Sequence, residues 1–478
     1  MSDETVGRTQ DLLFRYGFIL YRREQPPTNP GWYKVCSRWK SFAFDDLNLC
    51  VHPECEIRFD RQDGDFTIVL GTAFFVEPPY DRSVLHEFVG RGQPELFAVG
   101  DRLSGRFAVI ARRAGATVVF HDAYGTRSIA YRRTAPAALA SHPDLLATAY
   151  GTPTSPQAAE FLAANFKRRG VALLPGDLTM FEGISLLIPN NAYEFEAGIT
   201  RRYWPRRSIA ANDSITFHER CDDHFGGLAA FLRGRRPWLS LTGGIDSRLI
   251  IAACNCHDVD YRLFTWTFVS FEEWEREPID QLKALIGKEH VRLDREHAEP
   301  DEHAAIGVRN SGRLGGPSGA AAAMARLAFG EADPIYVTGI GGEVMRGFFN
   351  VKPTPLRSNS AEEMARAYVG RTWMDLERAA KADLIEAFDG FRLRANVEAA
   401  DGFGFDPNDL FYWEHRVACW SAPGRNSMDC ALPSLLGFNN RRLAETAYGL
   451  PPETRLTKSL FLEEIRRYDR RLAEVGFR

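Results

Sequence analysis

Short runs of β-branched and aromatic residues dominate the first part of the chain, separated by turns rich in glycine and aspartate. Their length and period-two alternation are typical of β strands. Strands are predicted over 16–21, 66–75, 105–111, 117–121, 128–131, 178–187 and 191–196, with a further strand or hairpin over 32–44. Helices are predicted only over 83–90 and 156–166. The N-terminal part is therefore expected to be mostly β.

The order of predicted strands and helices changes after the segment 201–213, which we interpret as a linker. Beyond it, short apolar runs predict strands over 238–241, 262–268, 290–293 and 335–338, and helical spacing predicts helices over 216–233, 249–254 and 279–286. Alternating strands and helices predict a parallel sheet with helices on both faces. From about residue 360 the chain is expected to be mainly helical. We therefore expect an α/β protein with domains at 1–205 and 206–478.

A glycine turn joins the strand at 238–241 to the helix that follows it. Gly243 and Gly244 permit a backbone path closed to other residues, and Asp246 and Ser247 fall in the first helical turn. Such a turn points backbone N–H groups at one spot and suits a phosphate. Asp246 would repel a bare phosphate, which favours a Mg²⁺ between them. The alternative is an ordinary strand–helix turn with structural glycines.

A second strand and glycine turn follow at 335–348. The turn carries Gly339 after Thr338, and an acid, Glu343. Ligands of parallel sheets bind at the carboxyl ends of the strands, where both turns are expected. Asp246 and Glu343 are therefore predicted to share a Mg²⁺ bound to phosphates.

Composition and charge narrow the class of protein. With 45% hydrophobic, 12% aromatic and 26% charged residues, the chain is globular rather than disordered. A net charge of −4 argues against a general nucleic-acid binder. The acidic segment Met1–Thr5 is not expected to be a signal peptide, and no run of 18 apolar residues predicts a membrane span. Eight scattered cysteines suit reduced thiols in the cytoplasm, and Cys50 and Cys55 fit no zinc spacing.

Taken together, the two turns resemble the motifs of the asparagine synthetase family, whose synthetase domains are N-type ATP pyrophosphatases. The family's Ser-Gly-Gly-x-Asp-Ser stands here as Thr242–Ser247, and its Ser-Gly-acid-Gly-x-Asp-Glu as Thr338–Val344. The segment 280–290 resembles the family's acid, helix and Gly-x-x-His stretch, and Asp429–Leu435 resembles its Glu-x-Arg-x-Pro-Phe-Leu stretch. Lys458 falls where the family carries a catalytic lysine.

The N-terminal half resembles the family's class II glutamine-amidotransferase domain through residues 105–110, 122–131 and 202–204. The resemblance thus covers nearly the whole chain. It implies an Ntn-type, β-rich αββα domain at 1–205. It also implies a doubly wound parallel sheet with a helical C-terminal part at 206–478.

The chain departs from the family at the glutaminase nucleophile. The family requires a cysteine at the mature N-terminus, where this chain has Ser2. Cys36, Cys50 and Cys55 are internal and lack the free α-amine that would act as base. The first domain is therefore expected to be a degenerate remnant, as in the β-lactam synthetase and lasso-peptide cyclase branches, and free glutamine is not the expected nitrogen donor.

The second motif also departs from the family. Ile340 replaces the acid of asparagine-forming enzymes and the tyrosine of β-lactam-forming ones. Glu343 replaces an aspartate, which keeps the carboxylate one methylene further out, and Val344 replaces a glutamate. Neither known product can therefore be carried over.

The resemblance implies binding of ATP and Mg²⁺ and activation of a carboxylate as an acyl-adenylate. It places the nucleotide at Leu241, Thr242, Gly243, Gly244, Asp246, Ser247, Thr338 and Gly339, and the metal at Asp246 and Glu343. Lys458 would stabilise charge in the reaction. We also consider Glu414, on an aromatic-rich helix, as the base that deprotonates the amine.

The resulting hypothesis is a carbon–nitrogen ligase that forms AMP and pyrophosphate. It would couple a small-molecule or peptide carboxylate to an amine and form a macrolactam, a lactam or an intermolecular amide without glutamine. One alternative is a catalytically drifted nucleotide-binding scaffold or partner subunit, and another is glutamine-dependent amidation like that of asparagine synthetase. No nucleic-acid or membrane partner is expected, whereas a homodimer stays open.

Overall fold

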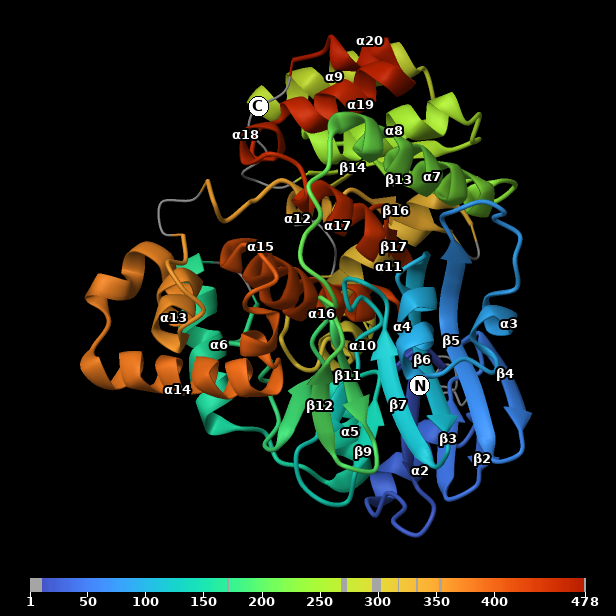
Figure 1. Ribbon diagram of the computed structural model, residues 1–478, viewed down its shortest axis with the longest axis vertical. Coiled ribbons are helices and arrows are strands. Elements are labelled where there is room, and N and C mark those ends of the chain that lie inside the picture. The colour runs from blue at the N-terminus through green and yellow to red at the C-terminus, as the bar shows by residue number, and fades with distance from the viewer. Residues whose placement is uncertain are drawn as a thin grey trace.

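The computed structural model describes residues 11–169, 172–267, 273–294, 302–316, 318–331, 334–351 and 355–476. The protein is mixed α/β, with two antiparallel sheets in its N-terminal half and a parallel sheet in its C-terminal half (Figure 1). The predicted α/β class is therefore confirmed. The boundary between domains at residue 205 stays a prediction.

Two six-stranded antiparallel sheets pack face to face in the N-terminal half. The first has the order β10-β8-β9-β1-β3-β2 and comprises β10 (Ile184–Leu186), β8 (Ala130–Arg132), β9 (Ala138–Ala140), β1 (Phe18–Arg22), β3 (Leu47–Val51) and β2 (Lys40–Phe44). The second has the order β12-β11-β7-β6-β5-β4 and comprises β12 (Ile199–Arg202), β11 (Asn191–Glu194), β7 (Ala116–His121), β6 (Leu103–Arg113), β5 (Asp65–Phe75) and β4 (Ile57–Gln62). Alternate residues of β1 and β3 pack on alternate residues of β5 and β6 to form a core.

Short helices border these sheets: α2 (Pro30–Cys36), α3 (Val84–Phe88), α4 (Gln93–Gly100), α5 (Pro143–Tyr150) and α6 (Pro156–Arg169). The prediction of a strand or hairpin over 32–44 is wrong for its first residues, which belong to α2. The side chain of Asn29 caps that helix by accepting from Gly31 N, and Pro30 occupies its first turn. These start signals outweigh the alternation that suggested a strand.

Five parallel strands form the sheet of the C-terminal half, in the order β15-β14-β13-β16-β17. They are β15 (His290–Asp294), β14 (Arg262–Thr267), β13 (Trp238–Ser240), β16 (Tyr336–Thr338) and β17 (Ser434–Leu436). β17 lies in the part predicted to be mainly helical. Its three residues are too few to show a period.

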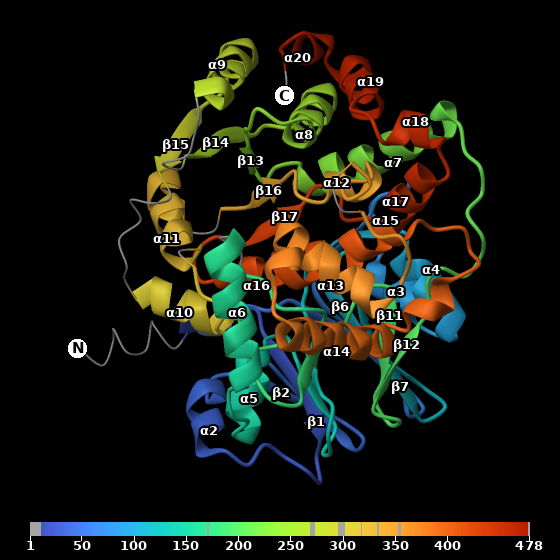
Figure 2. The same cartoon turned by 90° about the vertical axis from the view of Figure 1, so that its left-hand side faces the viewer.

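Helices cover both faces of this sheet (Figure 2). Leu239 and Val337 face α7 (Ser214–Leu232) and α8 (Ile245–Cys256), whereas Trp238 and Tyr336 face α11 (Ser318–Phe329) and α16 (Ala418–Met428). Nearby helices are α9 (Glu273–Ile286), α10 (Glu302–Asn310), α12 (Gly342–Met345), α15 (Pro407–Phe411), α17 (Arg441–Tyr448), α18 (Pro452–Arg455), α19 (Ser459–Tyr468) and α20 (Arg470–Ala473). The strands pack between helix layers, as the continuous apolar runs predict.

The two halves share one hydrophobic core. Phe74 of β5 stacks on Phe231 of α7 at 4.2 Å, and the rings of Trp204 and Trp413 lie 5.1 Å apart. Helices α13 (Ala361–Val369) and α14 (Arg378–Arg394) pack against the N-terminal half beside α6 (Figure 1). The segment 201–213 is not a free linker at its start, because β12 includes Arg202 and Trp204 is buried.

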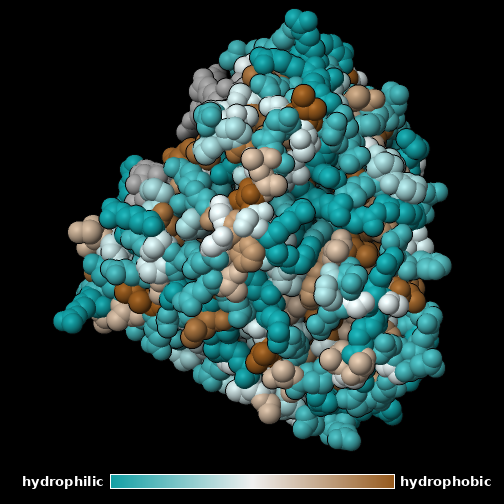
Figure 3. All heavy atoms as spheres, viewed as in Figure 1, coloured by the Kyte–Doolittle hydropathy of each residue, from teal (hydrophilic) through white to brown (hydrophobic). Residues whose placement is uncertain are grey.

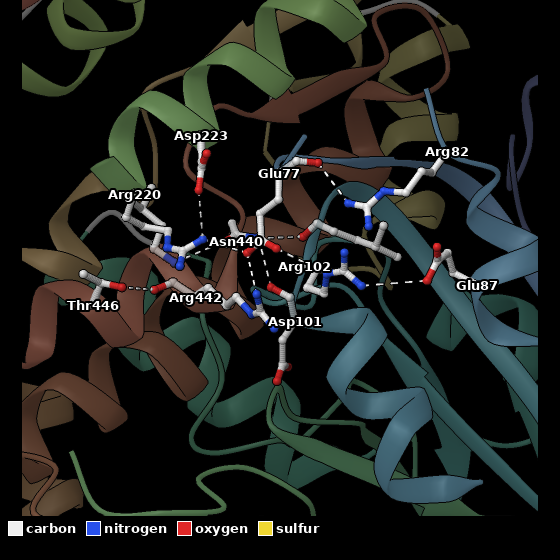
Figure 4. Close-up of polar contacts among 12 residues, drawn as sticks. Glu77, Arg82, Glu87, Asp101, Arg102, Arg220, Asp223, Asn440, Arg442 and Thr446 are labelled. Carbon is white, nitrogen blue, oxygen red and sulfur yellow. Dashed lines mark hydrogen bonds and ion pairs between the residues drawn. The ribbon is translucent and has the colours of Figure 1, made fainter. Parts of the chain in front are cut away.

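Ion pairs also join the halves. Glu77, at the end of β5, accepts from Arg220 of α7 at 2.7 Å and from Arg442 of α17 at 2.6 Å (Figure 4). It also accepts from Arg102 at 3.2 Å. One carboxylate thus connects the segment that follows β5 to two helices of the C-terminal half.

On the face shown in Figure 3, hydrophobic residues are scattered among hydrophilic ones and form no single large patch. None of the helices in the described part of the chain combines the length and apolar character needed to cross a bilayer.

Candidate functional site

The two glycine turns lie side by side at the carboxyl ends of β13 and β16, which are neighbouring parallel strands. A Cβ on Gly339 would lie 2.6 Å from the backbone N of Ser247, and a Cβ on Gly342 would overlap the Asp246 carboxylate. Glycine is required at both positions because the second turn packs directly against the start of α8. The expected proximity of the two motifs is therefore present.

The turn after β13 forms an open cradle. Nothing lies within 3.8 Å of a Cβ built on Gly243, and Gly244 caps α8 without any side-chain hydrogen bond. The hydroxyls of Thr242 and Ser247 bond each other at 2.7 Å across the turn, and Thr242 Oγ1 also accepts from Gly244 N at 3.2 Å. The N-terminus of this twelve-residue helix thus faces the turn uncapped, which suits a phosphate.

Two carboxylates meet beside this cradle. Burial and the neighbouring charge of Glu343 raise the pKa of Asp246 to about 7, although Arg346 acts in the opposite direction. Glu343 Oε2 accepts a hydrogen bond from Gly341 N at 3.2 Å, which holds the acid over its own turn. Two acids that share a site repel each other unless a cation lies between or beside them.

Arg346 is that cation in this structure, and the sequence did not single it out. Its guanidinium donates from Nη2 to both oxygens of Asp246, at 2.8 and 2.7 Å, and from Nε at 3.2 Å. The same group lies over the ring of Phe461 at 5.3 Å. A basic residue three positions after Glu343 was the only sequence signal for this contact.

Lys458 lies at the same place, just before α19. Burial, Arg346 and Arg248 lower the pKa of its ammonium group, while Asp246 acts in the opposite direction. Helix α19, which starts directly after Lys458, packs against α8, the helix whose start forms the cradle. The structure thus brings Lys458 to the cradle across more than 200 residues of sequence.

Arg248 connects the cradle to the C-terminal segment. It is fully buried and donates to the carbonyl oxygens of Val475 at 2.5 Å, Leu472 at 3.2 Å and Gly243 at 3.3 Å. The C-terminal segment is thereby fastened to the glycine turn. The sequence analysis missed this residue because only the tertiary structure supplies its carbonyl partners.

The N-terminal half contributes to the same site. Tyr124, in the loop after β7, is buried and its hydroxyl donates to Gly341 O at 3.3 Å. Burial and the charges of Glu343 and Asp246 raise its pKa far above the usual range. The pKa of Tyr412 is raised by burial and by the same two acids. Neither tyrosine was predicted, since no local pattern marks them.

Glu414, which we considered as a general base, is held elsewhere. It is 2% exposed and lies in a π-helical turn, Tyr412–Val417. Arg202 donates to both of its oxygens, at 2.7 and 2.8 Å, and Asn190 donates at 2.8 Å. The guanidinium of Arg202 and the amide of Asn190 together occupy both oxygens of this carboxylate with hydrogen bonds. These contacts favour a structural role in joining the two halves.

The residues at the cradle fit a nucleotide-bound metal better than an all-protein metal site. In the described part of the chain no three acidic, histidine or cysteine residues form a metal-binding group. Mg²⁺ is usually held by one or two carboxylates together with phosphate oxygens and waters. Asp246 and Glu343 beside an open anion cradle supply that donor set, provided that Arg346 moves off Asp246.

No protein-family model matches the chain, and a comparison with curated proteins found no match. We therefore infer function from the site itself.

Proposed function

We propose that the protein is an ATP-dependent carbon–nitrogen ligase of the asparagine synthetase type. It would adenylate a substrate carboxylate, release pyrophosphate and couple the acyl group to an amine. One observation carries the proposal: an uncapped helix N-terminus, two carboxylates and a lysine converge at the carboxyl ends of two neighbouring parallel strands. Ligands of open parallel sheets bind at this edge.

The finer fold assignment belongs to the same proposal. We assign the N-terminal half to the Ntn-type class II amidotransferase fold and the C-terminal half to the N-type ATP pyrophosphatase fold. Two stacked antiparallel sheets in the first half and a parallel sheet covered on both faces in the second support this assignment.

Each residue of the candidate site has a separate role in the proposed reaction. A carboxylate oxygen of the substrate attacks the α-phosphorus of ATP, and the bond to the β-phosphate breaks. The amine then attacks the acyl carbon, AMP leaves and the amine gives up a proton to water. We assign pyrophosphate binding to Thr242, Gly243, Gly244 and Ser247, and place Leu241, Thr338 and Gly339 beside the nucleotide. Asp246 and Glu343 would hold Mg²⁺, whose charge offsets that of the phosphates.

Two cations remain for the phosphates. If Asp246 held Mg²⁺, the guanidinium of Arg346 would be free of this carboxylate beside the cradle, where it could bind a phosphate bidentately. Lys458 already lies within electrostatic reach of the same groups. Donors aimed at developing charge in a partly buried site contribute strongly to catalysis.

We further propose that the amine does not come from glutamine. Burial raises the pKa of the Cys55 thiol to about 11, and burial raises the pKa of Cys36 well above its usual range. Such thiols are poor nucleophiles at neutral pH. Ser2 lies outside the described residues. The cytoplasmic location and the intramolecular or intermolecular nature of the bond stay predictions, as does a homodimer.

A nucleotide-binding scaffold is the second candidate. The contact that favours it is the bidentate pair of Arg346 with Asp246, which would persist if no Mg²⁺ displaced it. ATP–pyrophosphate exchange, measured with a panel of carboxylates, separates the two. Carboxylate-dependent exchange that Asp246→Asn abolishes supports the ligase. Nucleotide binding without exchange for any carboxylate supports the scaffold.

A further inference from the structure

A cavity of about 180 Å³ lies between the parallel sheet and the helices α11 and α16. Its walls include the aromatic rings of Trp266 on β14, Tyr336 on β16 and Trp420 on α16, together with Met428. Cavities that combine aromatic walls with a few polar groups are typical of small-molecule sites.

The cavity begins at the proposed nucleotide site. Ile340 lines it and also stands in the second glycine turn, between Gly339 and Gly341. Ile340 N donates to Thr338 Oγ1 at 3.4 Å, which holds the backbone of Ile340 within the turn that packs on α8. The wall of the cavity at this turn is therefore the aliphatic side chain of Ile340, which offers no partner to a charge in the side group of a substrate.

Two polar groups in the wall lack partners. Ser421 is 2% exposed, lines the cavity, and its Oγ has no hydrogen-bond partner. Arg425 also lines the cavity, and its buried Nε is likewise unpaired, although Nη1 donates to Ser434 Oγ at 3.3 Å. Buried polar groups are nearly always hydrogen-bonded, so an unpaired donor in a cavity wall calls for a ligand atom or a water.

We infer that this cavity binds the side group of the carboxylate substrate, and this inference rests on the ligase proposed above. The class of substrate is a carboxylic acid with an aromatic group whose far end carries an oxygen. The reacting carboxylate lies at the Ile340 mouth beside the nucleotide, the ring packs between Trp266 and Trp420, and the oxygen accepts from Ser421 and Arg425.

The size of the cavity supports a single side group. Sites for whole drug-sized ligands have volumes of roughly 300–1,000 Å³. A cavity of about 180 Å³ accommodates one ring system and leaves the rest of the substrate outside. An amino acid or peptide with a tyrosine-like side chain next to its reacting carboxylate meets this description.

The test compares three carboxylates that differ only in this group: propanoate, 3-phenylpropanoate and 3-(4-hydroxyphenyl)propanoate. Each is assayed with the full-length chain in two ways, by direct calorimetric binding and by ATP–pyrophosphate exchange. We expect the phenyl acid to bind at least about tenfold more tightly than propanoate, and the hydroxyphenyl acid more tightly still, since a buried ring and a matched hydrogen bond each contribute that much.

Three variants locate the binding. Ala321→Phe fills the cavity from α11 and should abolish the preference for aromatic acids. Ser421→Ala should weaken only the hydroxyphenyl acid, by about tenfold, because the phenyl acid offers no oxygen. Leu327→Ala, at an 83% exposed position on the same helix as Ala321, is the matched control and should change nothing.

The outcomes separate the two proposals. One outcome is exchange that is as fast with propanoate as with the aromatic acids and is unchanged in Ala321→Phe and Ser421→Ala. This outcome would overturn the cavity inference, while the ligase proposal would still hold. Selective binding of aromatic acids that these variants abolish, without any exchange, would support the cavity as their site and overturn the ligase. If Ala321→Phe fails to fold, Ser421→Ala still decides the point.

Discussion

At the scale of single residues, the candidate site is a small set of opposed charges. Asp246 and Glu343 are held close enough to repel each other, and Arg346 and Lys458 lie beside them. The sequence motifs did not indicate Arg346, yet its guanidinium donates directly to the carboxylate of Asp246. Asp246 can therefore either pair with Arg346 or, in the proposed function, bind a metal while Arg346 binds phosphate.

Lys458 is predicted to act on turnover and not on nucleotide binding. Lys458→Ala should lower kcat by about 10²–10³-fold, because it removes one positive donor aimed at charge that develops in the reaction. Calorimetry should show that Mg-ATP still binds. Arg466→Ala, at an exposed position on the helix that follows Lys458, is the control and should keep full turnover. Near-normal turnover of Lys458→Ala would remove the lysine from the mechanism.

The raised pKa of Asp246 predicts a pH dependence. Below pH 7 this carboxyl takes up a proton and loses the charge that attracts Mg²⁺, so Mg-ATP affinity should rise with pH and level off above about 8. Between the ordinary pKa of 3.8 and 7 the folded chain holds this proton while the unfolded chain does not. From this group alone, the free energy of unfolding therefore falls as pH rises across that window.

Neighbouring variants should move this titration in opposite directions. Glu343→Gln removes the repelling charge and should shift the midpoint to lower pH, whereas Arg346→Met removes the attracting charge and should shift it to higher pH. The midpoint is read from Mg-ATP affinity measured between about pH 6 and 9. An unchanged midpoint in both variants would show that another group controls the titration.

At the scale of elements, the site depends on how closely one glycine turn packs on another. The start of α8 leaves no room for a side chain at Gly339, while the backbone around Gly243 is open. Neither residue has the positive φ that would require glycine by itself. The close contact comes from the parallel pairing of β13 with β16, which sets both turns at the same level.

This difference predicts contrasting effects of one added methyl group. Gly339→Ala should lower the free energy of unfolding by about 1–3 kcal/mol, because the methyl meets the backbone N of Ser247, which cannot move alone. Gly243→Ala, where no atom lies within 3.8 Å, should change it by less than about 1 kcal/mol. Urea unfolding measures both, and equal losses would contradict the packing described for the two turns.

At the scale of the whole molecule, buried ion pairs and a shared core unite the two halves. Glu414 with Arg202, Asp429 with Arg106, and Glu77 with Arg220 and Arg442 connect residues from opposite halves. Removing one partner of a buried pair leaves an uncompensated charge and costs much more than removing an exposed pair. The N-terminal half is thus part of the structure that supports the site.

Glu414→Gln should therefore lower the free energy of unfolding by about 3–5 kcal/mol, since Arg202 would stay buried without its counter-charge. The matched control is Glu398→Gln, whose glutamate pairs with Arg392 but is 77% exposed, and which should cost no more than about 1 kcal/mol. Chemical denaturation gives both values. If Glu414→Gln keeps full stability but loses the amide-forming step, Glu414 is the base after all.

The sequence by itself determined much of the secondary structure and the local geometry of the site. Buried strands such as 66–75 have long apolar runs, and the turn after β13 carries its own glycines and helix signals. The expectation that Asp246 and Glu343 meet followed from the rule that parallel strands present their carboxyl ends at one edge. Local patterns suffice here because strand pairing and turn chemistry act over a few residues.

Only the tertiary structure decided which distant groups complete the site. Arg346 on Asp246, Tyr124 on Gly341 and the fastening of the C-terminal segment by Arg248 are contacts between positions that no short pattern connects. The same holds for Glu414, which looked like a base and lies in an ion pair with the other half. Burial and charge pairing depend on the packing of the whole chain, and they set what each ionisable residue can do.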